Sequence, residues 1–295
     1  MPARASPTVR RRRLALELRR LREEAGLTIE RVSRELECSQ SKVSRIETAH
    51  VTATPRDVRD MLALYGVDDA RRDELVQLAR EARHRGWWHE YRDDHADSAS
   101  YVGFEVAATS IHIYELRVVP GLLQIPEYAR AVIRAVSRGT SPATIARRVE
   151  LRMARQSILT EENPPSLWVV LDEAVLHRLV GGREVMRRQL DHLVERAQLP
   201  NVTLQVLPFT AGAHSGIDGA FEIHGFEEPG HPAVVHLEHL INQEYEDQPE
   251  VVRRYARSFD LLRATALGPD ESVARVGELA EQLSHLHLAK DTLPS

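Results

Sequence analysis

The chain has 295 residues, a length that favours two domains. Of these residues 42% are hydrophobic and 28% charged, a composition typical of a globular protein. No apolar run approaches the ~18–20 residues of a membrane span, and the Arg-rich N-terminus has no apolar stretch behind it, so we expect neither a membrane span nor a secretory signal. The net charge is −5, but residues 1–60 hold fourteen Lys or Arg against nine Asp or Glu and the rest carries −10, which predicts a basic nucleic-acid-binding module before an acidic domain.

The N-terminal residues are small and basic. Met1 to Thr8 contains two prolines, and Arg10 to Arg13 is a run of four arginines, so we expect a disordered basic arm over residues 1–12. In front of a nucleic-acid-binding module, such an arm could follow phosphates or enter the minor groove, with Arg11 and Arg12 among its contacts. The alternative is a solvated charge run that aids binding only non-specifically.

Two short helices joined by a tight turn are predicted between Leu27 and Glu47, after a first helix from Arg13 to Ala25. Thr28 and Ser39 are N-cap candidates, because each precedes a helical apolar period. The apolar spacing gives the helices a common buried face. Its members are Leu14, Leu18 and Leu21 in the first helix and Ile29, Val32, Leu36, Val43 and Ile46 in the short pair.

The outer face of the second short helix carries polar side chains: Gln40, Ser41, Lys42, Ser44 and Arg45. Such a face suits the major groove of DNA, because Gln pairs with adenine edges and Arg with guanine edges. The pattern therefore predicts a helix-turn-helix motif. The alternative is a plain helical bundle with a solvated polar face.

Three motifs carry a family resemblance over Arg13 to Tyr65. They are Ala25-Gly26-Leu27, Thr28-Ile29-Glu30-Arg31-Val32-Ser33 and Ser39-Gln40-Ser41-Lys42-Val43-Ser44-Arg45-Ile46-Glu47. This segment resembles the XRE family of phage-repressor-like helix-turn-helix domains. The resemblance implies base contacts from Gln40, Ser41 and Arg45, and a buried pair between Arg22 and Glu47. Two positions depart from the family pattern: Ile29 replaces a Gln that supports DNA contact, and Thr48-Ala49 replaces a Gly-containing helix stop.

Two further helices complete a five-helix domain at residues 13–85, of the lambda-repressor-like kind that the resemblance implies. Thr54 caps a helix with Pro55 at its first position, and Asp68 begins a fifth helix that reaches about His84. We expect phosphate contacts from the arm and from Lys42, Thr54 and Arg56. Thr28 and Ser44 complete the predicted DNA-binding surface.

Beyond a predicted linker at residues 86–100, the composition changes, and residues 101–289 are expected to form an α+β domain. Apolar runs with turn signals predict strands at 166–171, 202–207, 219–226 and 233–237. Helical periods predict helices at 104–119, 126–136, 142–159, 173–180, 184–197, 246–266 and 270–289. The fold class is thus mainly α with α+β: a helical first domain, then a small mixed sheet flanked by helices.

This second domain also carries recognisable motifs. They are Tyr114-Glu115, Val119-Pro120-Gly121-Leu122-Leu123-Gln124, Glu127-Tyr128-Ala129-Arg130, Arg152-Met153-Ala154-Arg155-Gln156, Leu171-Asp172-Glu173-Ala174, Gln189-Leu190 and Val206-Leu207-Pro208. They resemble a regulator domain, long catalogued as of unknown function, that follows XRE domains in actinobacterial regulators. That family includes antitoxin-like regulators, frequently partnered with a small protein encoded next door. The resemblance implies a partner-binding or signal-sensing domain and no enzyme.

Several residues suggest other chemistry. His236 and His239, and His285 and His287, do not match a defined zinc spacing, so no metal site or other cofactor is expected. His214 and Ser215 lack a nucleophile elbow, and Asp172 is better explained as a helix cap. We therefore expect no catalytic residues.

The turn from Pro120 to Gln124 could form the wall of a groove for a partner or ligand, or it could be an internal turn in the core. The lone Cys38 allows no internal disulfide, which indicates a reducing compartment, so a cytoplasmic, nucleoid-associated protein is expected. Together the patterns predict a DNA-binding transcriptional regulator. It is expected to act as a homodimer on double-stranded DNA, with a small protein encoded by a neighbouring gene as its partner. The alternative is a regulator whose second domain binds a small molecule.

Overall fold

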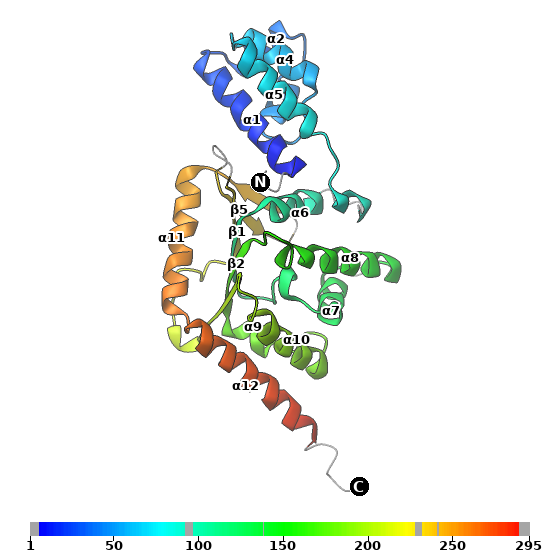
Figure 1. Ribbon diagram of the computed structural model, residues 1–295, viewed down its shortest axis with the longest axis vertical. Coiled ribbons are helices and arrows are strands. Elements are labelled where there is room, and N and C mark those ends of the chain that lie inside the picture. Colours follow the sequence, from blue (N-terminus) through cyan, green and yellow to red (C-terminus); the bar gives the residue numbers. More distant parts are fainter. Residues whose placement is uncertain (1–5, 92–96, 138, 228–231, 241, 289–295) are drawn as a thin grey trace. The chain divides into compact units, whose positions relative to one another are not determined.

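The computed structural model describes residues 6–91, 97–137, 139–227, 232–240 and 242–288. These residues form two compact units that divide between Ala107 and Ala108. The first unit is helical, and the second contains a six-stranded mixed sheet flanked by helices (Figure 1). The predicted fold class is confirmed.

Helix α1 (Pro7–Glu24) begins earlier than the sequence pattern predicted. The Ser6 side chain accepts a hydrogen bond from the Thr8 N–H at 3.2 Å, and Pro7 fits the first helical turn because its N–H would be unpaired there anyway. The disordered arm predicted over residues 1–12 is therefore wrong for residues 7–12, and residues 1–5 lie outside the described part of the chain. Ser6, one of the small residues that suggested disorder, is the cap of α1.

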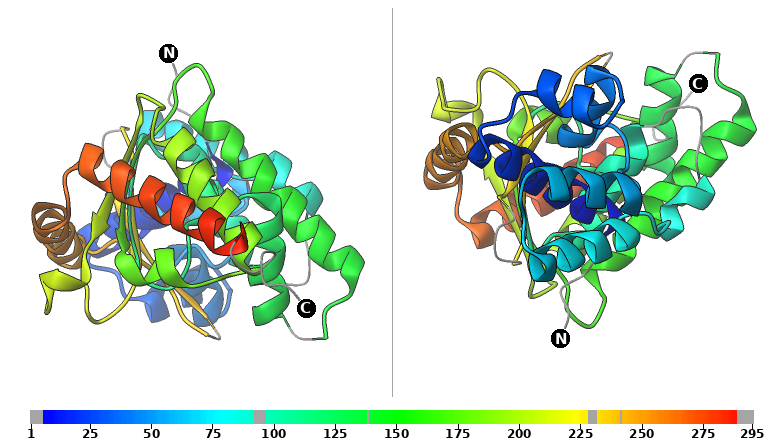
Figure 2. Two further views of the ribbon diagram at one scale, coloured as in Figure 1. Left: turned by 90° about the horizontal axis from the view of Figure 1, so that it is seen from below. Right: turned by 90° about the horizontal axis from the view of Figure 1, so that it is seen from above.

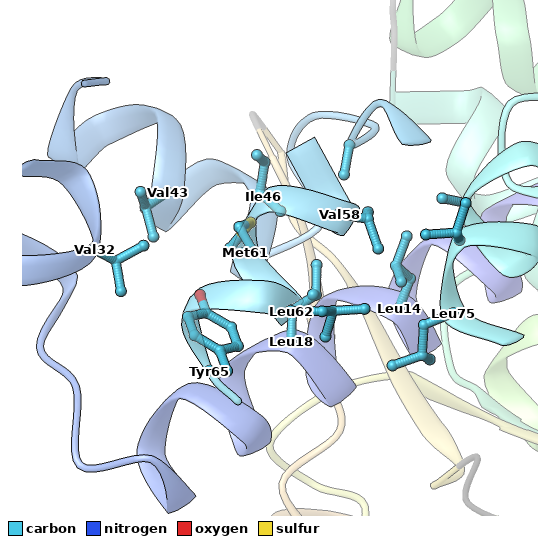
Figure 3. Close-up of a cluster of buried hydrophobic side chains, with 13 residues drawn as sticks. Leu14, Leu18, Val32, Val43, Ile46, Val58, Met61, Leu62, Tyr65 and Leu75 are labelled. Atoms are coloured by element: carbon cyan, nitrogen blue, oxygen red, sulfur yellow. The ribbon is translucent and has the colours of Figure 1, made fainter. Parts of the chain in front are cut away.

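Four shorter helices complete the predicted five-helix domain. They are α2 (Ile29–Glu35), α3 (Gln40–Glu47), α4 (Pro55–Leu64) and α5 (Asp69–Glu81). Their apolar sides meet α1 in one core (Figure 3), which includes Leu14, Leu18, Val32, Val43, Ile46, Val58, Met61, Leu62, Tyr65 and Leu75. Ile29 and Leu36 pack against this core, so the common buried face predicted for α2 and α3 is confirmed.

A short 3-10 helix, η1 (Trp87–Tyr91), and helix α6 (Asp97–Ala107) also belong to the first unit. Helix α6 packs on α1 at Gly103, where an added Cβ atom would lie 2.2 Å from the Thr8 Oγ1 atom. The linker predicted at residues 86–100 thus begins and ends in helical segments, and its residues 92–96 fall outside the described ones.

The second unit is built on a sheet with the order β3-β2-β1-β4-β5-β6. Its strands are β1 (Ser110–Glu115), β2 (Ser166–Asp172), β3 (Val202–Leu207), β4 (Phe221–Gly225), β5 (Val234–Glu238) and β6 (Gln243–Glu246). The pairs β1–β2 and β2–β3 are parallel, and the pairs β1–β4, β4–β5 and β5–β6 are antiparallel. The four predicted strands are confirmed, and β1 and β6 were not predicted.

Strand β1 corrects the prediction of one continuous helix over residues 104–119. Ile111 and Ile113 face one side of the sheet and Tyr114 the other, and all three are buried because the strand is central. Burial on both faces removes the polar alternation that marks a strand, so the apolar run resembled a helical period. Strand β6 is a polar edge strand and carries little apolar pattern.

Helices cover both faces of the sheet (Figures 1 and 2). Helix α11 (Pro249–Thr265) lies along one face, where Phe259 and Leu262 pack against Tyr114 and Phe221. Helices α7 (Pro126–Val136), α8 (Pro142–Arg155) and α10 (Arg183–Arg196) lie on the other side. Helix α9 (Glu173–His177) directly follows β2, and α12 (Pro269–Leu288) packs on α10 and β3. Among the described helices, none is both long and apolar enough to span a membrane.

Candidate nucleic-acid interface

A buried ion pair fixes helix α3 to helix α1. The Arg22 Nε and Nη2 atoms donate to the two carboxylate oxygens of Glu47 at 2.8 and 3.0 Å, and Nη1 donates to the Leu27 carbonyl at 2.8 Å. Only 10% of the Arg22 side chain and 3% of the Glu47 side chain are exposed. The hydrogen bonds to Glu47 raise the pKa of Arg22, so its guanidinium stays charged. The pair that the family resemblance implied is confirmed.

Side-chain caps set where α2 and α3 begin. The hydroxyls of Thr28 and Ser39 accept the backbone N–H three residues further on, at 3.2 and 3.1 Å, so both predicted caps are confirmed. In the turn between the helices, Glu37 has a φ of 48°, and the Cys38 N–H donates to the Ser33 carbonyl at 2.9 Å. This Schellman-type ending re-aims the chain so that α3 starts at Gln40.

The outer face of α3 presents the predicted base-reading side chains. Gln40, Ser41 and Arg45 are exposed, and among the described residues their side chains make no hydrogen bond or ion pair. Ser44 is half-buried on the same helix. The opposite face of α3 is buried in the core, so the helix is held from behind. Free amide and guanidinium groups on such a face match the donor and acceptor patterns of the major groove.

Lys42 differs from its neighbours because it is engaged. Its Nζ atom lies 2.6 Å from Asp57 Oδ1, which links α3 to α4. Asp57 also accepts hydrogen bonds from the Thr54 N–H at 3.1 Å and the Thr54 hydroxyl at 2.7 Å. Burial favours the neutral carboxyl, but the hydrogen bonds from Lys42 and Thr54 outweigh it and hold the pKa of Asp57 below its usual range.

The other residues predicted to contact phosphates differ in their exposure and in their existing partners. Thr54 is half-buried and shares a capping box with Asp57, because the Thr54 hydroxyl also accepts the Asp57 N–H at 3.0 Å. Arg56 has an 88% exposed side chain, 3.7 Å from Asp60. Thr28 is exposed but caps α2. Arg56 is therefore the most accessible of these three residues, and its exposed guanidinium can exchange the Asp60 carboxylate for a phosphate at little cost in free energy.

Two exposed arginines were not in the predicted set. Arg31 in α2 and Arg59 in α4 make no ion pair with any described residue. Their positions on the outer sides of α2 and α4 follow from the helical phase, since Val32 and Val58, one residue away on each helix, are buried. The helical phase can be read from the sequence, but nothing in the sequence distinguishes these two from the many other arginines.

Arg11 and Arg12 lie inside α1 and pack within the first unit. The Arg12 guanidinium lies 5.7 Å from the centre of the Phe104 ring, and Arg11 is half-buried. Burial, with the charge of Arg12 beside it, lowers the pKa of Arg11. A helix rises about 1.5 Å per residue, so Arg11 lies roughly 16 Å along α1 from the Arg22 that anchors α3. Arg11 and Arg12 therefore belong to a packed helix and not to the mobile, DNA-contacting arm that was predicted.

In the second unit, the turn from Pro120 to Gln124 is internal. The Gln189 side chain accepts the Ile125 N–H at 2.8 Å and donates to the Leu123 carbonyl at 2.7 Å. Gln124 donates to the Val119 carbonyl at 2.6 Å, and both glutamines are at most 2% exposed. This hydrogen bonding explains the sequence motif as a fold determinant and favours the core turn over the groove wall.

The residues that suggested catalysis or metal binding are engaged elsewhere. The Ser215 hydroxyl donates to the Ser258 carbonyl at 2.8 Å and not to His214. Asp172 caps α9 by accepting the Ala174 N–H at 2.8 Å, as predicted. Among the described residues no cluster of three or more His, Cys, Asp or Glu could hold a metal ion. The side chains of His285 and His287 fall outside the described residues.

One buried polar cluster was not predicted. On strand β4, Glu222 Oε2 lies 3.2 Å from His224 Nε2 and 3.7 Å from His236 Nδ1 of β5, whose ring stacks on Tyr245 at 5.1 Å. Burial opposes ionisation, but the two histidines hold the pKa of Glu222 well below its usual range. Glu222 and His236 are directly paired in the sheet register, and this register could not be derived from one sequence.

Comparison with known proteins divides the chain in two. A family model described as a helix-turn-helix domain matches residues 13–75, and a model described as a domain of unknown function, DUF5753, matches residues 98–278. No curated protein and no solved structure matches the chain. The first match begins within α1 and ends within α5, and the second begins within α6 and ends within α12.

Proposed function

Since the chain belongs to the DUF5753 family and carries a helix-turn-helix domain before that region, we propose that it is a sequence-specific DNA-binding transcriptional regulator. The observation that carries the proposal is the outer face of α3. There Gln40, Ser41 and Arg45 are exposed and without a partner among the described residues, on a helix that the buried Arg22–Glu47 pair holds in place.

In the proposed complex, base selection comes from α3. Arg45 is the strongest candidate, because a guanidinium can donate two hydrogen bonds to the O6 and N7 atoms of guanine. Gln40 can likewise bind the N6 and N7 atoms of adenine. Arg56, Arg31 and Arg59 supply phosphate contacts, which fix the register and give salt-dependent affinity without base preference.

The proposed active form is a homodimer. Helix α3 has eight residues and is therefore only about 12 Å long, so one copy can read only a few base pairs. A two-fold dimer doubles the site and requires half-sites separated by roughly one turn of DNA, about 34 Å, or a multiple of it. The operator is thus expected to be an inverted repeat.

The second unit is proposed to regulate DNA binding through a partner protein. Its exposed apolar side chains support a protein partner: Phe209 is 60% exposed and Ile217 66%, both in the connection from β3 to β4. That the partner is encoded by a neighbouring gene, as for antitoxin-like regulators, rests on the family resemblance. The alternative is a small-molecule effector bound by the same unit.

Binding experiments separate these possibilities. Fluorescence anisotropy with duplexes selected from a random library should give tight, salt-dependent binding to one inverted repeat. If no duplex is preferred over random sequence, the proposed function is wrong. Co-expression with the adjacent small open reading frame should yield a stable complex. A rise in melting temperature with a metabolite, and no complex, would favour the small-molecule alternative.

A further inference from the structure

Lys42 is the one cation on the outer face of α3 that the protein already neutralises. Its ammonium lies 2.6 Å from Asp57 Oδ1, and about half of its side chain, 47%, remains exposed. Its neighbour Arg45, on the same face, has no such partner among the described residues. Lys42 thus stands beside the proposed base-reading groups with its charge committed to α4.

Asp57 is built to stay charged and in place. Its other oxygen, Oδ2, accepts both the N–H and the hydroxyl of Thr54, at 3.1 and 2.7 Å, and only 22% of its side chain is exposed. The capping box fixes this carboxylate at the start of α4. The bond between Lys42 and Asp57 is therefore between a flexible donor and a rigid acceptor, and only the lysine can move away.

The residue type on α3 fits such a movement. The chain contains only two lysines among its 39 basic residues, Lys42 and Lys290. An arginine would bind a carboxylate through two parallel hydrogen bonds in a fixed plane. A lysine ammonium is a compact charge on a flexible stem, which can exchange one oxygen acceptor for another without such a constraint.

From these observations we infer that Asp57 is a specificity-determining residue of the proposed DNA-binding site, because it withholds Lys42 from phosphates until an operator holds the domain in register. On random DNA, Lys42 stays with Asp57, and the neutral pair adds no attraction for the phosphate backbone. On the operator, the base contacts of α3 keep one phosphate next to Lys42, and the ammonium moves to it. The inference rests on the proposed function and adds to it how non-specific binding is restrained.

The test uses two variants of the full-length chain. Asp57→Asn retains an oxygen that can accept from Thr54 but presents an amide N–H₂ to Lys42, so the cap is kept and the lysine is released. A released lysine adds one phosphate contact on a random 20-base-pair duplex, which steepens the slope of log K against log salt by about 0.9. Between 50 and 200 mM salt, the affinity of this variant for random DNA should therefore fall about threefold more than that of the wild type. Its slope on the selected operator should be unchanged, and its ratio of specific to non-specific affinity should fall.

The second variant guards against a failure of Asp57→Asn to fold. Lys42→Gln leaves the Thr54–Asp57 cap intact and should weaken operator binding more than random-DNA binding, because only the operator complex uses the Lys42 ammonium. Asp69→Asn, which makes the same charge change on α5, is the matched control and should leave the ratio unchanged. Equal weakening of operator and random DNA by Lys42→Gln would overturn the inference, as would identical salt slopes for Asp57→Asn and the wild type. If the wild type itself prefers no duplex, the proposed function fails, which is a different result.

Discussion

The Arg22–Glu47 pair gives the sharpest prediction for the fold of the first unit. Glu47→Ala removes the acceptor of three hydrogen bonds, at 2.8, 3.1 and 3.0 Å. It leaves an Arg22 side chain that is 10% exposed with the Leu27 carbonyl at 2.8 Å and a longer contact of 3.4 Å to the exposed Glu23 carboxylate. Leaving one member of a buried pair unpaired costs about 3–5 kcal/mol of unfolding free energy. For a unit of this size that corresponds to a fall of at least about 12 °C in melting temperature.

Urea unfolding can isolate this unit. Trp87 and Trp88 belong to the first unit, so a Trp168→Phe background makes tryptophan fluorescence report on it alone. The control is Arg34→Ala, which breaks an exposed pair with Glu30, 72% and 64% exposed, and should cost no more than about 0.5 kcal/mol.

A double variant separates the charge from the packing. Arg22→Met combined with Glu47→Leu replaces the buried pair by apolar side chains of similar size, which is often neutral or stabilising. We expect it to recover most of the stability that Glu47→Ala loses. A loss of unfolding free energy below about 1 kcal/mol for Glu47→Ala would show that this pair does not hold α3 in place.

Three further predictions concern single positions. Ala49→Gly should raise the unfolding free energy of the first unit by about 0.5–1 kcal/mol in urea unfolding, because Ala49 has a φ of 57°, where a Cβ atom is unfavourable. Gln189→Leu should lower the stability of the second unit by about 2 kcal/mol or more, because two buried backbone groups lose their partner. The pKa of Glu222 is lower in the folded protein than in the unfolded chain, where it is about 4.3. Glu222 therefore stabilises the fold at pH values above about 4.3, and this stabilisation is lost as the pH falls below that value towards the folded-state pKa. In a plot of unfolding free energy against pH, Glu222→Gln should therefore reduce the fall in stability at acid pH. The same fall in the variant and the wild type would contradict this prediction.

Local signals predicted the parts of the structure that local chemistry determines. The caps at Thr28 and Ser39, the apolar spacing behind them and the strands β2 to β5 follow from short stretches of sequence, and all are confirmed. The start of α1 was missed because Ser6-Pro7 suggested disorder, although the same pair is a cap followed by a residue suited to the first turn.

What the sequence could not supply depends on residues that meet only in the fold. Lys42 and Asp57 are 15 positions apart, and Glu222 and His236 are brought together by strand register. Strand β1 was assigned to a helix because its central place in the sheet buries both of its faces. The candidate base-reading residues, by contrast, were available from helical phase alone, because an exposed face is the complement of a buried one.

If the outer face of α3 reads DNA, replacing Arg45 should change the bases that the protein selects. The most direct test selects bound duplexes from a random library with the wild type and with Arg45→Ala, and compares the enriched sequences. We predict one inverted repeat for the wild type. We predict that Arg45→Ala loses the preference for guanine at one position in each half-site, a discrimination of about 1–3 kcal/mol. An identical motif for both proteins, or no enriched motif for the wild type, would show that Arg45 and the outer face of α3 do not select the bases.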